Sequence, residues 1–296
     1  MIGLRATGAV LFHTGRLGEA HATLERALAM YDPRTHAGMA SLYGTDHAQV
    51  TSCFLGLALW LLGDSVEGLA RLEWAVAHSE RLGHAHSVAL ALSYSCILAV
   101  MGRYEEMAQR CGDRLLELAA RNGLRLLGLS ARFCLAAAQR PRTSARLDEM
   151  HAAAEGWWGT HAVAYRPFVE GALAEAHADL GDVVDGLRLI TTAQTHVEAT
   201  NERWIEAELY RIHGRLLAST RPEEAETRWR RAIEVARAQD ARLWELRASR
   251  DFAEALDQRG QRAAACKVLD TVLARFPTTI DNSDVRAVRV LHASLA

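Results

Sequence analysis

Small and apolar residues recur along the chain in a fixed order that polar positions interrupt. The order begins with a small or apolar residue, an apolar residue three positions later and a chain-breaking position at plus seven. Small, large apolar and small residues then follow at plus twelve, sixteen and nineteen. The segments that follow this template begin at or near Gly8, Gly56, Ser95, Phe133, Ala174, His213 and Ala253. Their spacing is 38 to 41 residues, except that the first two lie 48 residues apart.

Each segment has the pattern of a helical hairpin. Small residues let two helices approach closely, and the large apolar residues fill the space between them. Glycine at plus seven, as at Gly15, Gly63 and Gly181, is suited to end the first helix because it tolerates a left-handed backbone conformation. Prolines are also found at the expected helix boundaries, in the pairs Asp32-Pro33, Arg140-Pro141, Arg221-Pro222 and Phe276-Pro277.

A single hairpin leaves an apolar face uncovered, so the hairpins have to stack on one another. Almost nothing in the chain has the alternating pattern of a strand. We therefore predict an all-α fold, a right-handed αα-superhelix of about seven helical hairpins that forms one solenoid over residues 1–296. The fourth segment is degraded, since Arg140-Pro141 replaces the glycine. We expect the solenoid to bend near residues 130–165.

The template resembles the tetratricopeptide repeat (TPR), lengthened from its usual length of about 34 residues. The stretches "LALWLLGDSVEGLARLEWAVAHSERLGH" and "AETRWRRAIEVARAQDARLWELRAS" are similar to the helical-repeat region of bacterial AAA- or STAND-type ATPase signalling proteins. In those proteins the repeats accompany a class III adenylate cyclase or a transcription-regulator domain. The resemblance reaches along nearly the whole chain, and the matching motifs are packing motifs.

The resemblance implies a non-enzymatic scaffold or sensor. Such a module would bind a protein, a peptide or a small signal molecule in its concave groove and relay that binding to a signalling output domain. The alternative is that the chain is the C-terminal fragment of an ATP-dependent transcription regulator or a nucleotide cyclase. The catalytic domains would then lie outside the 296 residues.

Composition narrows the classes of partner and compartment. The chain has 34 basic and 36 acidic side chains, a balance that argues against a surface built to neutralise a nucleic-acid backbone. Five scattered cysteines without a C-x-x-C pair are typical of reduced thiols in a cytosolic core. No apolar run approaches the ~20 residues of a membrane span, and the N-terminus lacks the pattern of a signal peptide. We expect a cytoplasmic protein that binds neither nucleic acid nor membrane.

The sequence contains no motif for catalysis or for a cofactor. There is no G-x-x-x-x-G-K-[ST] loop and no G-x-S-x-G. The histidines His78, His84 and His86 cluster, but zinc sites need three or four converging ligands, so we predict no metal site. We predict that the chain is not an enzyme. An α/α enzyme with an acid pair across the groove is a third alternative, which carboxylates of strongly raised pKa in a deep pocket would support.

The stretch "RWIEAELYRIHGRLL", residues 203–217, holds most of the candidate polar chemistry. Its apolar residues recur at the spacing of one helix face, which predicts a packed stripe. Off that stripe, Glu208 lies three residues before Arg211, which predicts an exposed ladder of ion pairs worth roughly a few tenths of a kcal/mol each. The other reading is ligand contact by Glu208, Tyr210 and Arg211, because the first helix of each hairpin lines the concave side in TPR arrays.

Two further segments are candidates for partner contact. Residues 30–48 lengthen the first linker and gather His36, Tyr43 and Asp46, residue types that suit a recognition loop. Two tight turns joined by a short helix would explain that segment equally well. Trp157 and Trp158 are adjacent, so on a helix they point about 100° apart and are hard to bury together. An exposed aromatic there would mark a partner surface.

Overall fold

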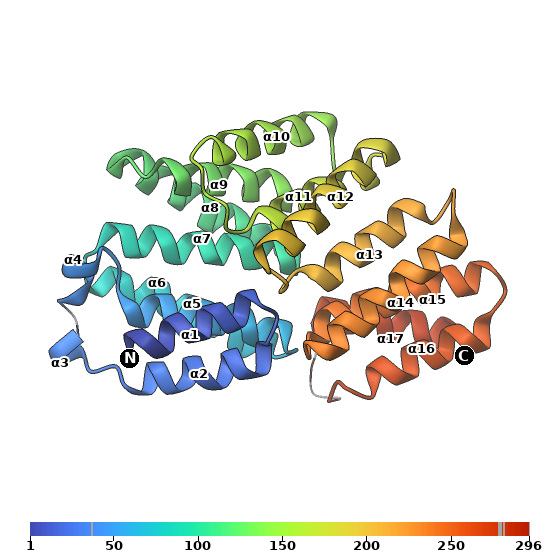
Figure 1. Ribbon diagram of the computed structural model, residues 1–296, viewed down its shortest axis with the longest axis horizontal. Helices are drawn as coiled ribbons and strands as arrows, with labels where there is room; N and C mark the ends of the chain where they lie inside the picture. The colour runs from blue at the N-terminus through green and yellow to red at the C-terminus, as the bar shows by residue number, and fades with distance from the viewer. Residues whose placement is uncertain (37, 278–279, 281, 296) are drawn as a thin grey trace.

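The structure is a computed structural model that describes residues 1–36, 38–277, 280 and 282–295. Within these residues it contains seventeen helices and no strand (Figure 1). The first eight are α1 (Ile2–His13), α2 (Leu17–Ala29), α3 (Pro33–His36), α4 (Met39–Tyr43), α5 (His47–Leu61), α6 (Ser65–Arg81), α7 (Ala85–Gly102) and α8 (Glu105–Asn122). The others are α9 (Arg125–Ala138), α10 (Ser144–Trp158), α11 (Arg166–Asp179), α12 (Val183–Thr200), α13 (Glu206–Leu217), α14 (Pro222–Ala238), α15 (Arg242–Gln258), α16 (Arg262–Leu273) and α17 (Ser283–Leu295).

Fourteen of these helices form seven consecutive hairpins, which confirms the predicted all-α fold and the number of repeats. The pairs are α1/α2, α5/α6, α7/α8, α9/α10, α11/α12, α13/α14 and α15/α16. The short helices α3 and α4 occupy the segment that lengthens the first repeat, and α17 packs against α15 and α16. The added segment thus corresponds to the second reading, of short helical turns, more closely than to an irregular loop.

The small residues of the template lie where helices touch, as the sequence predicts. In the hairpin α5/α6, a Cβ added to Gly68 would lie 2.7 Å from the backbone oxygen of Gly56, and one added to Gly56 would lie 2.8 Å from the oxygen of Gly68. The glycines at plus seven behave as predicted too, since Gly63 and Gly181 have φ values of 102° and 79°. Both values belong to the region that side chains rarely adopt.

The most apolar helices lie at the centre of the N-terminal hairpins. Every residue of α5 is buried. Helix α7 is 18 residues long and, by length and composition alone, apolar enough to cross a membrane, so the expectation that no apolar run approaches a membrane span is wrong for this helix. However, 78% of this apolar window is buried inside the structure, where α7 packs against α5, α6, α8 and α9. Helix α7 is therefore accounted for as a core helix.

The superhelix curls far enough for its first hairpins to contact its last ones. Figure 1 shows α1 to α6 beside α13 to α17, with α7 to α12 arched over both groups. At the contact, the rings of Phe12 and Trp204 stack at 5.4 Å, and the rings of Trp60 and Trp244 meet edge to face at 5.4 Å. The backbone N–H of Arg203 donates to the carbonyl of His13 at 2.6 Å. Part of the concave side is thus filled by aromatic packing instead of forming an open groove.

Candidate binding groove

The inner side of the C-terminal hairpins holds a buried cluster of charged residues centred on Arg211 of α13. The Arg211 side chain is fully buried. Its Nε and Nη2 atoms donate to the two carboxylate oxygens of Glu208, each at 2.7 Å. Nη1 donates to Asp251 of α15 at 2.6 Å, and Nη2 also donates to Glu175 of α11 at 2.6 Å. Burial opposes the charge of Arg211, but the three carboxylates outweigh it and raise its pKa, so the guanidinium stays charged.

This geometry contradicts the prediction of an exposed ion-pair ladder on residues 203–217. Glu206, Glu208 and Arg211 are all buried. The apolar stripe packs as predicted, but the polar side of α13 is also covered, because α11 and α15 supply partners to Arg211. A helix in the middle of a solenoid has neighbours on both sides, so both faces lose contact with water. The ion pairs of this helix therefore belong to the interior.

The cluster follows the register of the repeat. Glu175 precedes Arg211 by 36 residues, and Asp251 follows it by 40. Successive first helices present equivalent faces to one another, so side chains about one repeat apart come into contact. The same relation continues from α15 to α17, where Arg247 Nη2 donates to Asp284 at 2.6 Å across 37 residues.

Glu175 links the buried cluster to the rim of the groove. Besides Arg211, it contacts Arg103 and Arg215 at 3.2 Å each and Arg140 at 3.6 Å. Burial alone would raise the pKa of Glu175, but the surrounding guanidinium groups, Arg211 foremost, hold it well below the usual range. Arg103 lies at the end of α7 in a left-handed conformation, with a φ of 57°, which turns the chain there.

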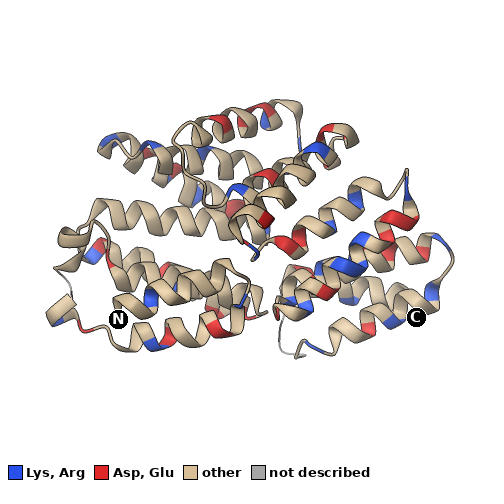
Figure 2. Ribbon diagram, viewed as in Figure 1, with Lys and Arg blue, Asp and Glu red and all other residues tan. Residues whose placement is uncertain are grey.

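A cavity of about 320 Å³ opens beside this cluster. Its lining comes from α11, α13, α14, α15 and the ends of two earlier first helices: Arg103, Arg140, Glu175, Asp179, Arg215, Ala218, Trp229, Arg250, Asp251, Glu254, Ala255 and Gln258. A second space of about 30 Å³ adjoins it through Arg103 and Glu175 and is lined mainly by apolar residues, among them Met101, Phe168 and Leu209. Figure 2 shows α7 free of charged residues, whereas α13 to α15 carry both signs. We call these two spaces together the charged groove.

The structure places the candidates of the first linker elsewhere. Asp46 is buried and caps α5, since its carboxylate accepts from the backbone N–H of Gln49 at 2.7 Å. It also pairs with His78 at 3.2 Å. Tyr43 is 52% exposed at the end of α4, and His36 is half-buried in a stack with Tyr31. Asp46 thus has a structural role here, while recognition by His36 and Tyr43 stays a prediction.

The adjacent tryptophans divide between core and surface. Trp157 is buried, so the prediction that it contacts a partner is wrong, whereas only one of the two tryptophans is buried, as expected for an adjacent pair. Trp158 is half-buried, and the guanidinium of Arg166 lies 4.9 Å from its ring centroid. Tyr210 is half-buried and faces α14, where Arg231 lies 5.9 Å from its ring. Of the predicted site residues, only Glu208 and Arg211 come together, in the buried cluster beside the charged groove.

Sequence reasoning missed most residues of the charged groove. Glu175, Asp251 and Arg103 belong to different repeats, and none stands in a recognisable motif. The repeat spacing could have predicted them, because the acidic partners of Arg211 lie about one repeat before and one repeat after it in the sequence.

Comparison with known proteins identifies the fold. No family model matches the chain. Its structure is similar to the crystal structure of yeast Tom70, with a TM-score of 0.51 and 14% sequence identity; the match covers 94% of this chain and 60% of that one. At this identity the likeness shows the fold alone, a TPR-like helical-repeat fold.

Sequence similarity reaches one stretch of a much longer protein. An uncharacterized protein of Rhizobium meliloti (strain 1021) is 31% identical over 112 residues, which are 36% of this chain and 11% of that protein. The chain therefore spans less than two thirds of the length of each of these two proteins.

Proposed function

We propose that this chain is a non-enzymatic scaffold that binds an extended polypeptide segment of a protein partner in the charged groove. The observation that carries the proposal is the cavity of about 320 Å³ on the inner side of TPR-like hairpins, beside a buried network of ions. The buried ions fix the positions of the arginines at the rim before any partner arrives. A binding surface that is ordered in advance loses less entropy on association.

The lining of the groove indicates the chemistry of the partner segment. The side chains of Arg140 and Arg215 pair with Glu175 and Asp179 but are still 33% and 31% exposed. The exposed part of each guanidinium group can also meet a carboxylate of a partner. The adjoining space is apolar and accepts a small hydrophobic side chain. The groove thus fits a segment with an acidic residue next to an apolar one. Binding across the third to seventh hairpins, which line the groove, would favour one curvature, which an attached output domain would sense.

Two carboxylates of the groove, Glu175 and Asp251, favour binding over acid-base catalysis, whereas burial raises the pKa of Glu254, which also lines the cavity. A general acid that works near neutral pH needs a raised pKa. Glu175 and Asp251 instead have pKa values lowered by neighbouring arginines, chiefly Arg211, which outweigh the effect of burial. These two carboxylates are permanent anions that hold arginines in place.

A peptide library tests this proposal. We expect the purified chain to select peptides that pair an acidic with an apolar residue, and the variants Arg140→Ala and Arg215→Ala to lose about tenfold affinity or more, measured by fluorescence anisotropy. Arg121→Ala is the matched control, because Arg121 is 73% exposed on α8. Equal binding by the control and the two groove variants, or no selected peptide, would overturn the proposal.

A second candidate follows from the Rhizobium protein, of which the matched segment forms only 11%. The segment that resembles this chain therefore lies within a much longer polypeptide. In that setting the chain would be the C-terminal part of an ATP-dependent transcription regulator or a nucleotide cyclase. Sequencing the DNA upstream of the coding region distinguishes the two: an adjoining frame with a Walker-type ATPase supports the second candidate, and an unrelated gene contradicts it.

A further inference from the structure

The fifth repeat departs from the template at a buried packing position. The template places an apolar residue three positions after its start, and five other repeats have leucine there: Leu11, Leu59, Leu98, Leu216 and Leu256. The fifth repeat has His177 at this position, on α11. The residue is only 5% exposed. An imidazole at a packing position costs stability unless its nitrogens have partners, so His177 needs polar neighbours that the leucines do without.

Both ring nitrogens of His177 have partners outside its own helix. The Nδ1 atom lies 2.9 Å from the carboxylate oxygen Oδ2 of Asp182, and the Nε2 atom lies 3.0 Å from Nε2 of His151 on α10. The contact with His151 crosses from the fourth hairpin to the fifth and orients the His177 ring. The Nδ1 atom is therefore directed at the turn between α11 and α12.

The end of α11 places Asp182 beside this nitrogen. Gly181 has a φ of 79°, and the backbone N–H of Asp182 donates to the carbonyl of His177 at 2.9 Å, which is the hydrogen bond that closes a helix ending in a left-handed glycine. The two carboxylate oxygens of Asp182 then have different roles. Oδ1 accepts from the backbone N–H of Asp185 at 3.3 Å and caps α12, whereas Oδ2 is directed at His177.

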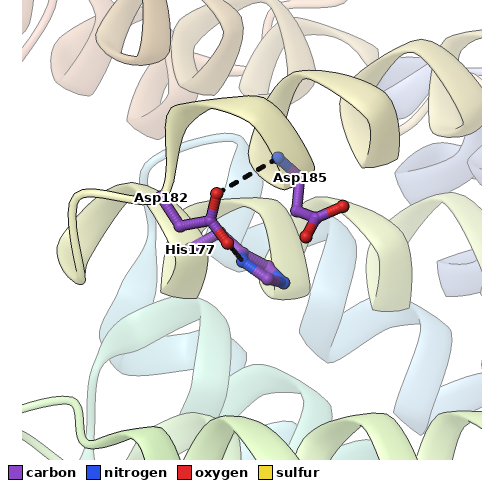
Figure 3. Close-up of side chains that lie close together, drawn as sticks. All are labelled: His177, Asp182 and Asp185. Atoms are coloured by element: carbon purple, nitrogen blue, oxygen red, sulfur yellow. Dashed lines mark hydrogen bonds and ion pairs between the residues drawn. The ribbon is translucent and has the colours of Figure 1, made fainter.

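Asp185 completes a set of three metal-ligand side chains at this turn. One donor atom each from His177, Asp182 and Asp185 all lie within 4.8 Å of one another. Figure 3 shows these three side chains gathered where α11 turns into α12. The Asp185 carboxylate also accepts from Arg188 at 3.0 Å through its Oδ1 atom. The Asp182 and Asp185 side chains are 44% and 48% exposed, so an ion can reach them from solvent and the carboxylates can turn toward it.

From this arrangement we propose that His177, Asp182 and Asp185 bind one divalent transition-metal ion such as Zn²⁺, and that His151 orients the His177 ring. Two ligand atoms about 2.1 Å from one ion and at right angles to each other are about 3.0 Å apart. The observed distance between Nδ1 of His177 and Oδ2 of Asp182 is 2.9 Å. One imidazole with two carboxylates suits a transition-metal ion better than Mg²⁺ or Ca²⁺, which prefer oxygen ligands alone. Water completes the coordination from the solvent side.

Binding rearranges the protons of the two imidazole rings. Without the ion, the neutral His177 ring donates its Nδ1 proton to Asp182, whose ionised carboxylate only accepts hydrogen bonds. The ion replaces this proton, which leaves to solvent. The proton between the two Nε2 atoms then belongs to His177, and the half-buried His151 takes up another from solvent at its Nδ1 atom. A metal-bound histidine whose second nitrogen donates to a neighbouring group is the usual arrangement at such sites.

Zinc titration of the chelator-treated full chain tests the proposal. We expect one Zn²⁺ per chain by isothermal titration calorimetry, Co²⁺ absorption bands in the visible range, and a higher melting temperature with Zn²⁺. The decisive variant is His177→Leu, which has the residue of the other repeats and should therefore fold. Its Zn²⁺ affinity should fall by more than the roughly 10- to 100-fold that is typical when a group supporting a ligand is lost. Asp182→Asn keeps the helix cap, because asparagine caps as well as aspartate, and should weaken binding about tenfold or more, as should Asp185→Asn.

The outcomes separate a metal site from a hydrogen-bonded helix cap. Equal Zn²⁺ affinity in the wild type and His177→Leu overturns the proposal, as does a wild type that binds no Zn²⁺. Should His177→Leu fail to fold, equal affinity in the wild type, Asp182→Asn and Asp185→Asn overturns it in the same way. His86→Gln, at an exposed position of α7, is the control for histidines outside the site and should bind like the wild type.

A further variant tests the role of His151. We expect His151→Gln to weaken Zn²⁺ binding less than His177→Leu does and to leave the Co²⁺ bands at their wild-type wavelengths, because the variant loses an orienting contact and no ligand. Shifted bands would contradict this role. The proposal does not depend on the peptide groove, because these experiments measure metal affinity and not partner binding.

Discussion

Neighbouring hairpins pack against one another through apolar residues in the N-terminal part of the superhelix and through buried ions in the C-terminal part, although both parts follow the same hairpin template. In the N-terminal part, α5 and α7 carry no Asp, Glu, Lys or Arg, and all of α5 is buried. In the C-terminal part, α13 and α15 bury Glu208, Arg211, Arg247 and Asp251. The template specifies the contact between the two helices of one hairpin. It leaves the face toward the next hairpin free to be apolar or ionic.

The two solutions differ in how they respond to change. Apolar burial is non-directional and is roughly proportional to area, so it tolerates rearrangement. A buried ion network depends on geometry, and removal of one member leaves its partners charged and without compensation. The ionic part of the superhelix should therefore be the more sensitive to single substitutions.

Removal of the central cation should give the largest effect. We expect Arg211→Ala to lower the free energy of unfolding by roughly 3–5 kcal/mol, because Glu175, Glu208 and Asp251 would keep their charges in a buried site. Arg211→Lys should lose less stability than Arg211→Ala but should remain less stable than the wild type, since an ammonium cannot reproduce the paired contact with Glu208. Urea unfolding followed by circular dichroism measures both. Arg121→Ala is the exposed control, and a loss no larger than its own would contradict a buried network.

The apolar part is best tested at its tightest contact. Gly68→Ala places a methyl group 2.7 Å from the backbone oxygen of Gly56, and a backbone atom cannot move aside cheaply. We expect a loss of about 1–3 kcal/mol in the free energy of unfolding by the same measurement. Gly18→Ala in α2 is the control, because nothing lies within 4 Å of the added atom. A neutral Gly68→Ala would show that the helices approach less closely than described.

A smaller effect is expected in the pH dependence of stability, because buried histidines and buried carboxylates change stability over different pH ranges. Burial lowers the pKa of His213 to about 4, from its ordinary value of 6.5. The unfolded chain therefore binds a proton between these values that the folded chain does not, so stability falls as the pH drops from 6.5 to 4. Glu175 and Asp251 have lowered pKa values, so their stabilisation is lost only below the pKa of an unfolded carboxyl group, about 4.

Melting temperatures across this pH range measure the effect. We expect His213→Gln to lose less stability than the wild type between pH 6.5 and 4.5, and His86→Gln to follow the wild type. Parallel curves for all three proteins would show that other buried groups, such as His13, carry the pH dependence.

The candidate site was harder to predict from the sequence than the fold was, because its residues come from different repeats and meet only in the folded chain. Gly56 and Gly68 predict a close approach of two helices, and Gly63 predicts a left-handed turn. Glycine, which has no Cβ, is the residue that fits both places best. The pattern around Arg211 shows an arginine off an apolar stripe, which describes a surface helix as well as a doubly covered one. His151 of α10 and His177 of α11, whose Nε2 atoms lie 3.0 Å apart, give no signal in the sequence, because a pair 26 residues apart on separate helices has no local spacing rule.

The amino-acid sequence by itself determined the hairpins, their number and most of their joints, because these follow from periodicity within about 40 residues. The tertiary structure alone decided which faces lose water. The curl of the superhelix brings Phe12 to Trp204 and Trp60 to Trp244, and it encloses Arg211 among carboxylates of neighbouring repeats. The periodicity of apolar residues predicts which side of a helix packs against the other helix of the same hairpin. Whether the opposite side meets solvent or another repeat depends on the curvature that accumulates over the entire stack.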